Sequence, residues 1–217
     1  MKSNIWSKSA WSVRLLLALT GLVYEGNSQQ SAEVKQPKLT VRLFNQARTE
    51  GHLVARAINV AKRILNESGI ETEWLANPSK LDIEQRVKQD RQAISPLQLT
   101  LRIVPQLGVQ TTGFRGPLGF AAVDQGVGVH ASISYRRVLE TAKTKVVEAH
   151  QVLGHAMAHE IGHLLLGANS HSADGIMRSQ WRKAELRKAE LGVLGFTPHQ
   201  AEQMRLHIRR NVQSEAP

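Results

Sequence analysis

The alternation of apolar and polar residues predicts a mixed sheet in the first half of the chain. Three segments show the period of two that is typical of a half-buried strand: residues 39–43, 70–74 and 97–103. Between the first two, apolar residues recur at helical spacing from Leu53 to Asn66, and Gly69 follows as a helix stop. This order of elements is typical of a sheet with a crossover helix. Residues 81–94 are charged and only weakly periodic, which indicates a short helix or a loop.

The second half of the chain predicts helices that follow a glycine-rich loop and one further strand. From residue 108 to 128, six glycines and one proline indicate a loop that turns sharply, and residues 127–135 favour a strand. Gly167 ends the first helix, and Thr197 with Pro198 marks the start of the last one. Three helices are expected here: residues 150–166, residues 181–191 and a segment that starts at residue 198.

The composition limits which metal ligands and partners the protein can have. Of the 217 residues, 41% are hydrophobic and 21% charged, which is typical of a single globular domain. The chain has no cysteine, so a metal site would have to use histidine and carboxylate ligands. The formal charge of +10 allows acidic partners. Since aromatic residues are not interleaved with the cations, we expect no nucleic-acid partner, and we interpret the basic run 178–188 as a solvated helix face.

The first residues have the order of a secretory signal peptide. Lys2, Lys8 and Arg14 give a basic start, and the apolar run 15–23 is well short of the roughly 20 residues that span a bilayer. We expect a secreted or periplasmic protein without a stable membrane anchor; an amphipathic or disordered leader is the alternative. The expected division of the chain is a signal peptide over 1–28, a linker over 29–37 and a catalytic domain over 38–217.

The residues suited to catalysis gather on the helix predicted over residues 150–166. Residues 159–163 follow the pattern H-E-x-x-H. Because residues four apart lie on one helix face, His159 and His163 can bind the same Zn²⁺. Glu160 is rotated away from that face, so it suits a general base better than a ligand. His155, one turn earlier, is too far from His163 to share the ion, and we expect it to support the site or to face solvent.

The motif and the residues after it resemble the metzincin clan of zinc metallopeptidases. The clan has H-E-x-x-H-x-x-G-x-x-H followed by a methionine turn, whereas residues 159–171 follow H-E-x-x-H-x-x-x-G-x-x-x-H. The resemblance implies that His171 is the third zinc ligand and that Met177, as the Met-turn residue, packs beneath the metal without binding it.

The longer spacing before the third histidine leaves other ligands open. Asp174 lies just after the helix, where some zinc peptidases place an aspartate, and Glu185 lies on the next helix, as in thermolysin-like enzymes. Asn169 and Ser170, which directly precede His171, are candidates to orient that ring through hydrogen bonds.

The order of elements also resembles the clan. It implies an α+β, zincin-like fold in which a mixed twisted β-sheet has an edge strand over the active-site helix, with a crossover helix and a C-terminal helix. Residues 118–121 and 128–133 are most similar to the archaemetzincin branch, without the cysteines of its second zinc site. The clan's strand before the active-site helix is an edge that pairs with extended substrate, so residues 127–133 are the expected edge. Its expected substrate-binding residues are Gly128, Val129, His130 and Ala131.

The resemblance implies a zinc-dependent metalloendopeptidase that hydrolyses peptide or protein substrates. Glu160 is expected to act as general base toward a zinc-bound water. Two alternatives stay open: a catalytically inactive zinc-binding protein of the same fold, and a thermolysin-like regulatory peptidase with Glu185 as third ligand.

Overall fold

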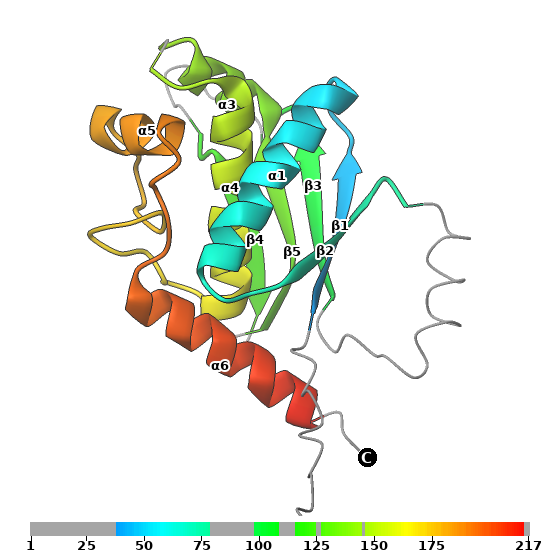
Figure 1. Cartoon of the computed structure of the whole chain (residues 1–217). Coiled ribbons are helices and arrows are strands. Elements are labelled where there is room, and N and C mark those ends of the chain that lie inside the picture. The colour runs from blue at the N-terminus through cyan, green and yellow to red at the C-terminus, as the bar shows by residue number, and fades with distance from the viewer. Residues whose placement is uncertain (1–37, 79–97, 109–115, 125–126, 145, 215–217) are drawn as a thin grey trace, which may run out of the picture. The chain divides into compact units, whose positions relative to one another are not determined.

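Five strands in one mixed sheet and five helices make up the described part of the chain (Figure 1). The computed structural model describes residues 38–78, 98–108, 116–124, 127–144 and 146–214. The strands are β1 (Leu39–Asn45), β2 (Thr72–Ala76), β3 (Gln98–Val104), β4 (Gly119–Asp124) and β5 (Val127–Ser134). The helices are α1 (Gly51–Glu67), α3 (Tyr135–Ala142), α4 (Ala149–Leu166), α5 (Lys183–Glu190) and α6 (Pro198–Ser214). The prediction of an α+β fold with a mixed sheet is thus confirmed.

Three sequence-based expectations concern residues outside this part of the chain. The expected signal peptide, the expected linker and the segment 81–94 all lie outside the described residues. Among the helices that the structure describes, none combines the length and the apolar character needed to cross a bilayer.

The sheet has the strand order β2-β1-β3-β5-β4. The first four strands in this order run parallel, and β4 pairs antiparallel with β5. Val41 at the middle of β1 stands opposite Trp74 of β2 and Leu99 of β3. Alternate residues of β1 and β3 point into the core, as their period of two predicted. The fully covered ones are Leu39, Val41, Leu43, Leu99, Leu101 and Ile103.

Helices α1 and α4 lie side by side against the sheet (Figure 1). Helix α4 also contacts α3, α5 and α6, which explains why it is apolar nearly all round rather than on one face. Gly154 of α4 marks the closest approach of the two helices, because a Cβ at this position would lie 2.6 Å from the carbonyl oxygen of Ala57 and from Cβ of Val60. The long helix that carries H-E-x-x-H is therefore held on several sides.

Two predictions about the glycine-rich region are wrong. Residues 119–124 are not loop but strand β4, because their backbone pairs with β5 although the local glycines favour turns. As a result β5 lies between β3 and β4 and is not the edge, so the expectation that residues 127–133 form the edge strand is wrong. Strand β4 has that position instead. Helix α3, which Ser134 begins by accepting a hydrogen bond from the backbone N–H of Arg137, was not predicted.

The close contact of α1 with α4 gives a testable prediction. Gly154→Ala places a methyl group against backbone and should lower the free energy of unfolding by about 1–3 kcal/mol. Gly51→Ala is the matched control, since nothing lies within 4 Å of a Cβ at that position. It should change stability by less than about 0.5 kcal/mol in the same urea titration. Equal effects of the two substitutions would contradict the tight packing.

Candidate metal centre

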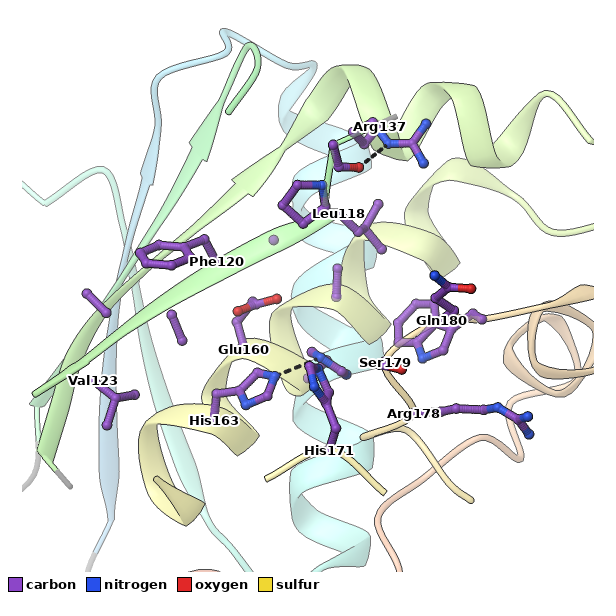
Figure 2. Close-up of a pocket in the computed structure, with 18 of the residues that line it drawn as sticks. Leu118, Phe120, Val123, Arg137, Glu160, His163, His171, Arg178, Ser179 and Gln180 are labelled. Carbon is purple, nitrogen blue, oxygen red and sulfur yellow. Dashed lines mark hydrogen bonds between the residues drawn. The ribbon is translucent and has the colours of Figure 1, made fainter. Parts of the chain in front are cut away.

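Three histidines bring their ligand atoms together at one end of a cleft (Figure 2). His159 and His163 come from α4 and His171 from the segment after it, and one nitrogen from each lies within 4.8 Å of the others. The Nε2 atoms of His159 and His163 are 3.0 Å apart. Two nitrogens bound to a tetrahedral zinc ion would lie roughly 3.3 Å apart, so this pair is close to the spacing of ligands. His171 thus joins the group that the sequence predicted.

The extra residues between the second and third histidines are accommodated by left-handed backbone. Gly167 ends α4 with φ of +90°, and its N–H donates to the carbonyl oxygen of His163. Asn169 also has a positive φ, +61°, which asparagine tolerates better than most residues. These two residues reverse the chain so that His171 returns to the helix. The predicted helix stop at Gly167 is confirmed, and Asn169 helps to form the turn through its backbone. That the side chain of Asn169 orients His171 stays a prediction.

Hydrogen bonds on the far side of two rings orient them. His159 donates from Nδ1 to the carbonyl oxygen of Ile176 at 2.7 Å, which leaves the lone pair of Nε2 free for a metal. His163 Nδ1 lies 2.8 Å from Oγ of Ser170. Ser170 was expected to orient His171, and this expectation is wrong because its hydroxyl contacts the neighbouring ligand. When that hydroxyl accepts, both Nε2 atoms are acceptors and repel each other unless a cation lies between them.

Burial favours the uncharged form of these two histidines. Desolvation lowers the pKa of His159 to about 4 and that of His163 to about 4, and the neighbouring imidazoles act in the same direction. A neutral imidazole is the form that binds a metal ion. Near neutral pH the rings therefore already have the protonation state that a metal requires.

Trp181 supports the same arrangement, although sequence patterns did not point to it. Its indole Nε1–H donates to the carbonyl oxygen of Ile176 at 3.0 Å, so this oxygen accepts from both Trp181 and His159. The indole also lies edge-on to the ring of His159, with the centroids 5.8 Å apart. Trp181 thus fixes both the ring of a ligand and the acceptor that orients it.

Glu160 is buried beside the histidines and against strand β4. Its carboxyl oxygen Oε2 has no hydrogen-bond partner among the described residues. Desolvation raises the pKa of Glu160 to about 8. The carboxyl group fits against Gly119, where a Cβ would lie only 2.2 Å from Oε1. The missing side chain at the start of β4 therefore leaves the space that Glu160 occupies (Figure 2).

Met177 lies under the helix that carries the ligands. It is fully buried, and its sulfur occupies the space beside Gly162, where a Cβ would be 2.5 Å from Sδ. The phenyl ring of Phe196 fills the rest of that space, 2.7 Å from the same Cβ position. Met177 therefore packs directly on the backbone next to His163.

The alternative third ligands are not part of the cluster. Asp174 is exposed, and neither it nor Glu185 belongs to the group of ligand atoms found among the described residues. Glu185 Oε1 instead pairs with Arg178 at 3.2 Å, and Oε2 accepts from the backbone N–H of Arg182 at 2.8 Å. The latter hydrogen bond is the main reason that the pKa of Glu185 is lowered. His171 is thus the residue that completes the group.

A cleft of about 1230 Å³ runs past the three histidines. Residues 119–123 of β4 line it on one side and residues 178–181 on another, and Arg137 of α3 lies at one end (Figure 2). Thr141 of α3 also lines the cleft. Of the substrate-binding residues expected on β5, His130 lines the cleft. Ala131 is buried and is not among the lining residues, because β5 is an interior strand that is paired on both sides. The exposure of Gly128 and of Val129 lies outside what the structure describes.

His155 is neither a ligand nor solvated. Its ring is fully buried, with Nδ1 2.8 Å from the carbonyl oxygen of Gln151 and no partner for Nε2 among the described residues. Desolvation lowers the pKa of His155 to about 4. From the sequence, His155 was expected either to support the site or to face solvent. The second alternative is wrong, because the ring is buried. Its one aromatic neighbour given by the structure is Trp181, edge-on at 6.2 Å.

No protein-family model matches the chain, and no curated protein matches its sequence. The resemblance to metzincins therefore stays a prediction, which depends on the motif and on the chemistry of the site.

The hydrogen bond between Ser170 and His163 gives a prediction about metal affinity. Ser170→Ala leaves Nδ1 of His163 without its partner and should weaken metal binding roughly 10- to 100-fold, measured by competition with a chromophoric chelator. Ser179→Ala is the control, because Ser179 is exposed and lines the same cleft. It should bind metal as the wild type does. A Ser170→Ala variant with unchanged affinity would show that the hydroxyl does not orient the ligand.

The buried His155 gives a prediction about pH. The unfolded chain takes up a proton at this residue below pH 6.5, whereas the folded protein does so only near pH 4, so stability is lost as the pH falls through this range. Between pH 7 and pH 4.5 the wild type should lose about 2 kcal/mol more of its unfolding free energy than His155→Leu does. Because both proteins contain the other histidines, the contribution of those residues to the pH dependence cancels in this comparison. Parallel losses in urea titrations at the two pH values would contradict this.

Proposed function

We propose that this protein is a zinc-dependent metallopeptidase of the metzincin type. The observation that carries this proposal is the convergence of His159, His163 and His171 at a cleft beside the carboxyl group of Glu160. Three imidazole ligands and an adjacent acidic group are the parts of an open, catalytic zinc site, whereas a structural zinc site is closed by four protein ligands.

The residues present fit zinc. Imidazole nitrogens suit this metal, and the two rings of α4 have acceptors that hold their Nε2 atoms toward one point. When bound, zinc supplies a Lewis acid that polarises a scissile carbonyl and acidifies water. Because the described cluster holds three ligands and opens to the cleft, a coordination position is left for substrate chemistry.

Glu160 is the group that would move the proton. Its carboxyl lies beside the ligands but outside their group, with Oε2 free of other partners among the described residues. Burial alone favours the neutral carboxyl group, whereas the positive charge of a bound metal ion would favour the carboxylate. In that form Glu160 would take a proton from water as general base and hand it to the leaving amine. Gly119 leaves room for the carboxyl group, because a side chain there would collide with Oε1.

Strand β4 supports an extended peptide as substrate. It is the last strand of the described sheet, and it forms one side of the cleft in which Glu160 lies. An edge strand offers backbone N–H and C=O groups to a ligand that is itself extended, and this form of recognition suits a peptide main chain. The role predicted for β5 therefore moves to β4, and His130 contributes from the neighbouring strand.

The proposal is tested by metal analysis and by cleavage of an unbiased peptide mixture. The wild type should contain about one zinc per chain and cleave peptides. Glu160→Gln should keep the zinc and lose cleavage by roughly 10²- to 10⁴-fold, because the general base is gone. His171→Ala should lose both zinc and cleavage.

Asp174→Asn is the matched control, since Asp174 follows the same loop but is exposed and outside the cluster. It should retain zinc and activity. Stoichiometric zinc without cleavage of any peptide would favour the inactive binding protein. Zinc retained in His171→Ala would refute His171 as a ligand.

A further inference from the structure

Two aliphatic side chains extend into solvent at the end of α5. Leu191 is 71% exposed and Val193 is 68% exposed, the highest values among the large hydrophobic side chains of the described residues. The other face of α5 is covered, because Leu186 and Ala189 pack into the core. The exposure therefore belongs to one face of the helix and to the turn that follows it.

Backbone hydrogen bonds hold this turn in place. Gly192 has φ of +73°, and the N–H groups of Gly192 and Val193 bond back to the carbonyl oxygens of Ala189 and Lys188 at 3.0 and 2.9 Å. This is the pattern of a helix that ends at a left-handed glycine. Arg63 of α1 also donates to the carbonyl oxygen of Gly192 at 2.7 Å. Leu191 and Val193 thus extend from a turn that is hydrogen-bonded both to the end of α5 and to Arg63 of α1.

Exposed cations accompany them. Lys183, Arg187 and Leu191 are spaced four residues apart, so they share one face of the helix, and Lys188 lies beside them. Among the described residues, no carboxylate lies within ion-pair distance of these three cations.

Two basic residues of α6 differ in this respect, because Arg205 and Arg209 both pair with Glu202. Arg210 of α6 is exposed and has no ion-pair partner among the described residues. Helix α5 also carries an exposed carboxylate, Glu190, whose Oε2 accepts from the backbone N–H of Glu148. What distinguishes α5 is that its three unpaired cations lie next to the two exposed aliphatic residues.

We propose that the exposed face of α5 and the turn after it form a docking surface for an anionic phospholipid membrane. Leu191 and Val193 enter the boundary between headgroups and acyl chains, while Lys183, Arg187 and Lys188 lie against the lipid phosphates. This pairing of a basic helix face with protruding aliphatic residues is the pattern of reversible interfacial binding. It requires no membrane-spanning segment.

Other anionic partners fit the surface less well. Single-stranded nucleic acid is bound through aromatic side chains, and this face presents aliphatic ones. An acidic protein would match the cations but leaves the exposure of Leu191 and Val193 unexplained. The proposal does not depend on the proposed peptidase activity, because α5 contributes no metal ligand.

The chain has no cysteine, so a single probe can be placed on this surface. The full chain carrying Val193→Cys is labelled with the environment-sensitive fluorophore NBD and mixed with vesicles of phosphatidylcholine containing about 30% phosphatidylglycerol. The emission should rise and shift to the blue with these vesicles and stay unchanged with phosphatidylcholine alone. Leu139→Cys on α3, labelled in the same way, is the control and should show no shift, because Leu139 lies outside the proposed surface. The probe reports on its own surroundings, so its signal is separate from any binding by the first residues of the chain.

Charge variants in the Val193→Cys background complete the test. Arg187→Gln with Lys188→Gln should raise the lipid concentration at half-maximal signal by about 30-fold. Arg209→Gln with Arg210→Gln is the matched control and should change it less than threefold, with folding of each variant checked by circular dichroism. An absent signal with anionic vesicles, an equal signal at Leu139→Cys, or no effect of removing Arg187 and Lys188 would each overturn the proposal.

Discussion

The candidate metal centre depends on one backbone carbonyl, that of Ile176. It accepts hydrogen bonds from His159 Nδ1 and from the indole of Trp181, while the N–H of Ile176 donates to the carbonyl oxygen of Gly195. A histidine ligand needs a fixed acceptor behind it, because otherwise its ring rotates away from the metal. Here that acceptor belongs to a buried turn which is itself tied to the segment before α6. His159 is therefore positioned by residues that are far from it in the chain, Ile176, Trp181 and Gly195.

A second constraint is that charged and polar groups are buried near this turn. Glu160 and His155 are both covered on the same helix, and burial shifts the pKa of each toward the uncharged form. Such groups cost stability unless they serve a purpose or find a partner. For Glu160 the proposed function gives such a purpose, since a carboxyl group with an unpaired oxygen beside three candidate metal ligands would be placed to act as a general base.

Local sequence patterns predicted the features that depend on neighbouring residues alone, such as helix faces and helix ends. The spacing of His159 and His163 follows from helix geometry, so the sequence predicted that they share a face. Gly167 ended the helix as predicted, because a left-handed residue there favours glycine. The capping pair Thr197 and Gln200, which exchange hydrogen bonds at the start of α6, also follows a local rule.

Pairing across the sheet could not be predicted in the same way. Strand β4 was interpreted as loop because the glycines of the segment 108–128 are locally unfavourable for a strand, and the pairing of β4 with β5 overrides that preference. Which strand is the edge depends on this pairing, so the sequence-based prediction assigned the substrate strand to β5, one strand later in the chain than the edge strand β4. The roles of Ser170 and Trp181 were missed for a related reason, since their partners are set by the return of the chain and not by spacing.

The absence of a side chain at Gly162 has a mechanical consequence. The sulfur of Met177 and the ring of Phe196 rest directly on the helix backbone between the ligands, so the ligand helix and the region before α6 share one packed joint. A metal ion held by His159, His163 and His171 would tie the ligand helix to the segment after it a second time. Loss of such an ion would then leave the paired strands intact while the C-terminal third loosens first, and this region would be a metal-dependent unit of folding.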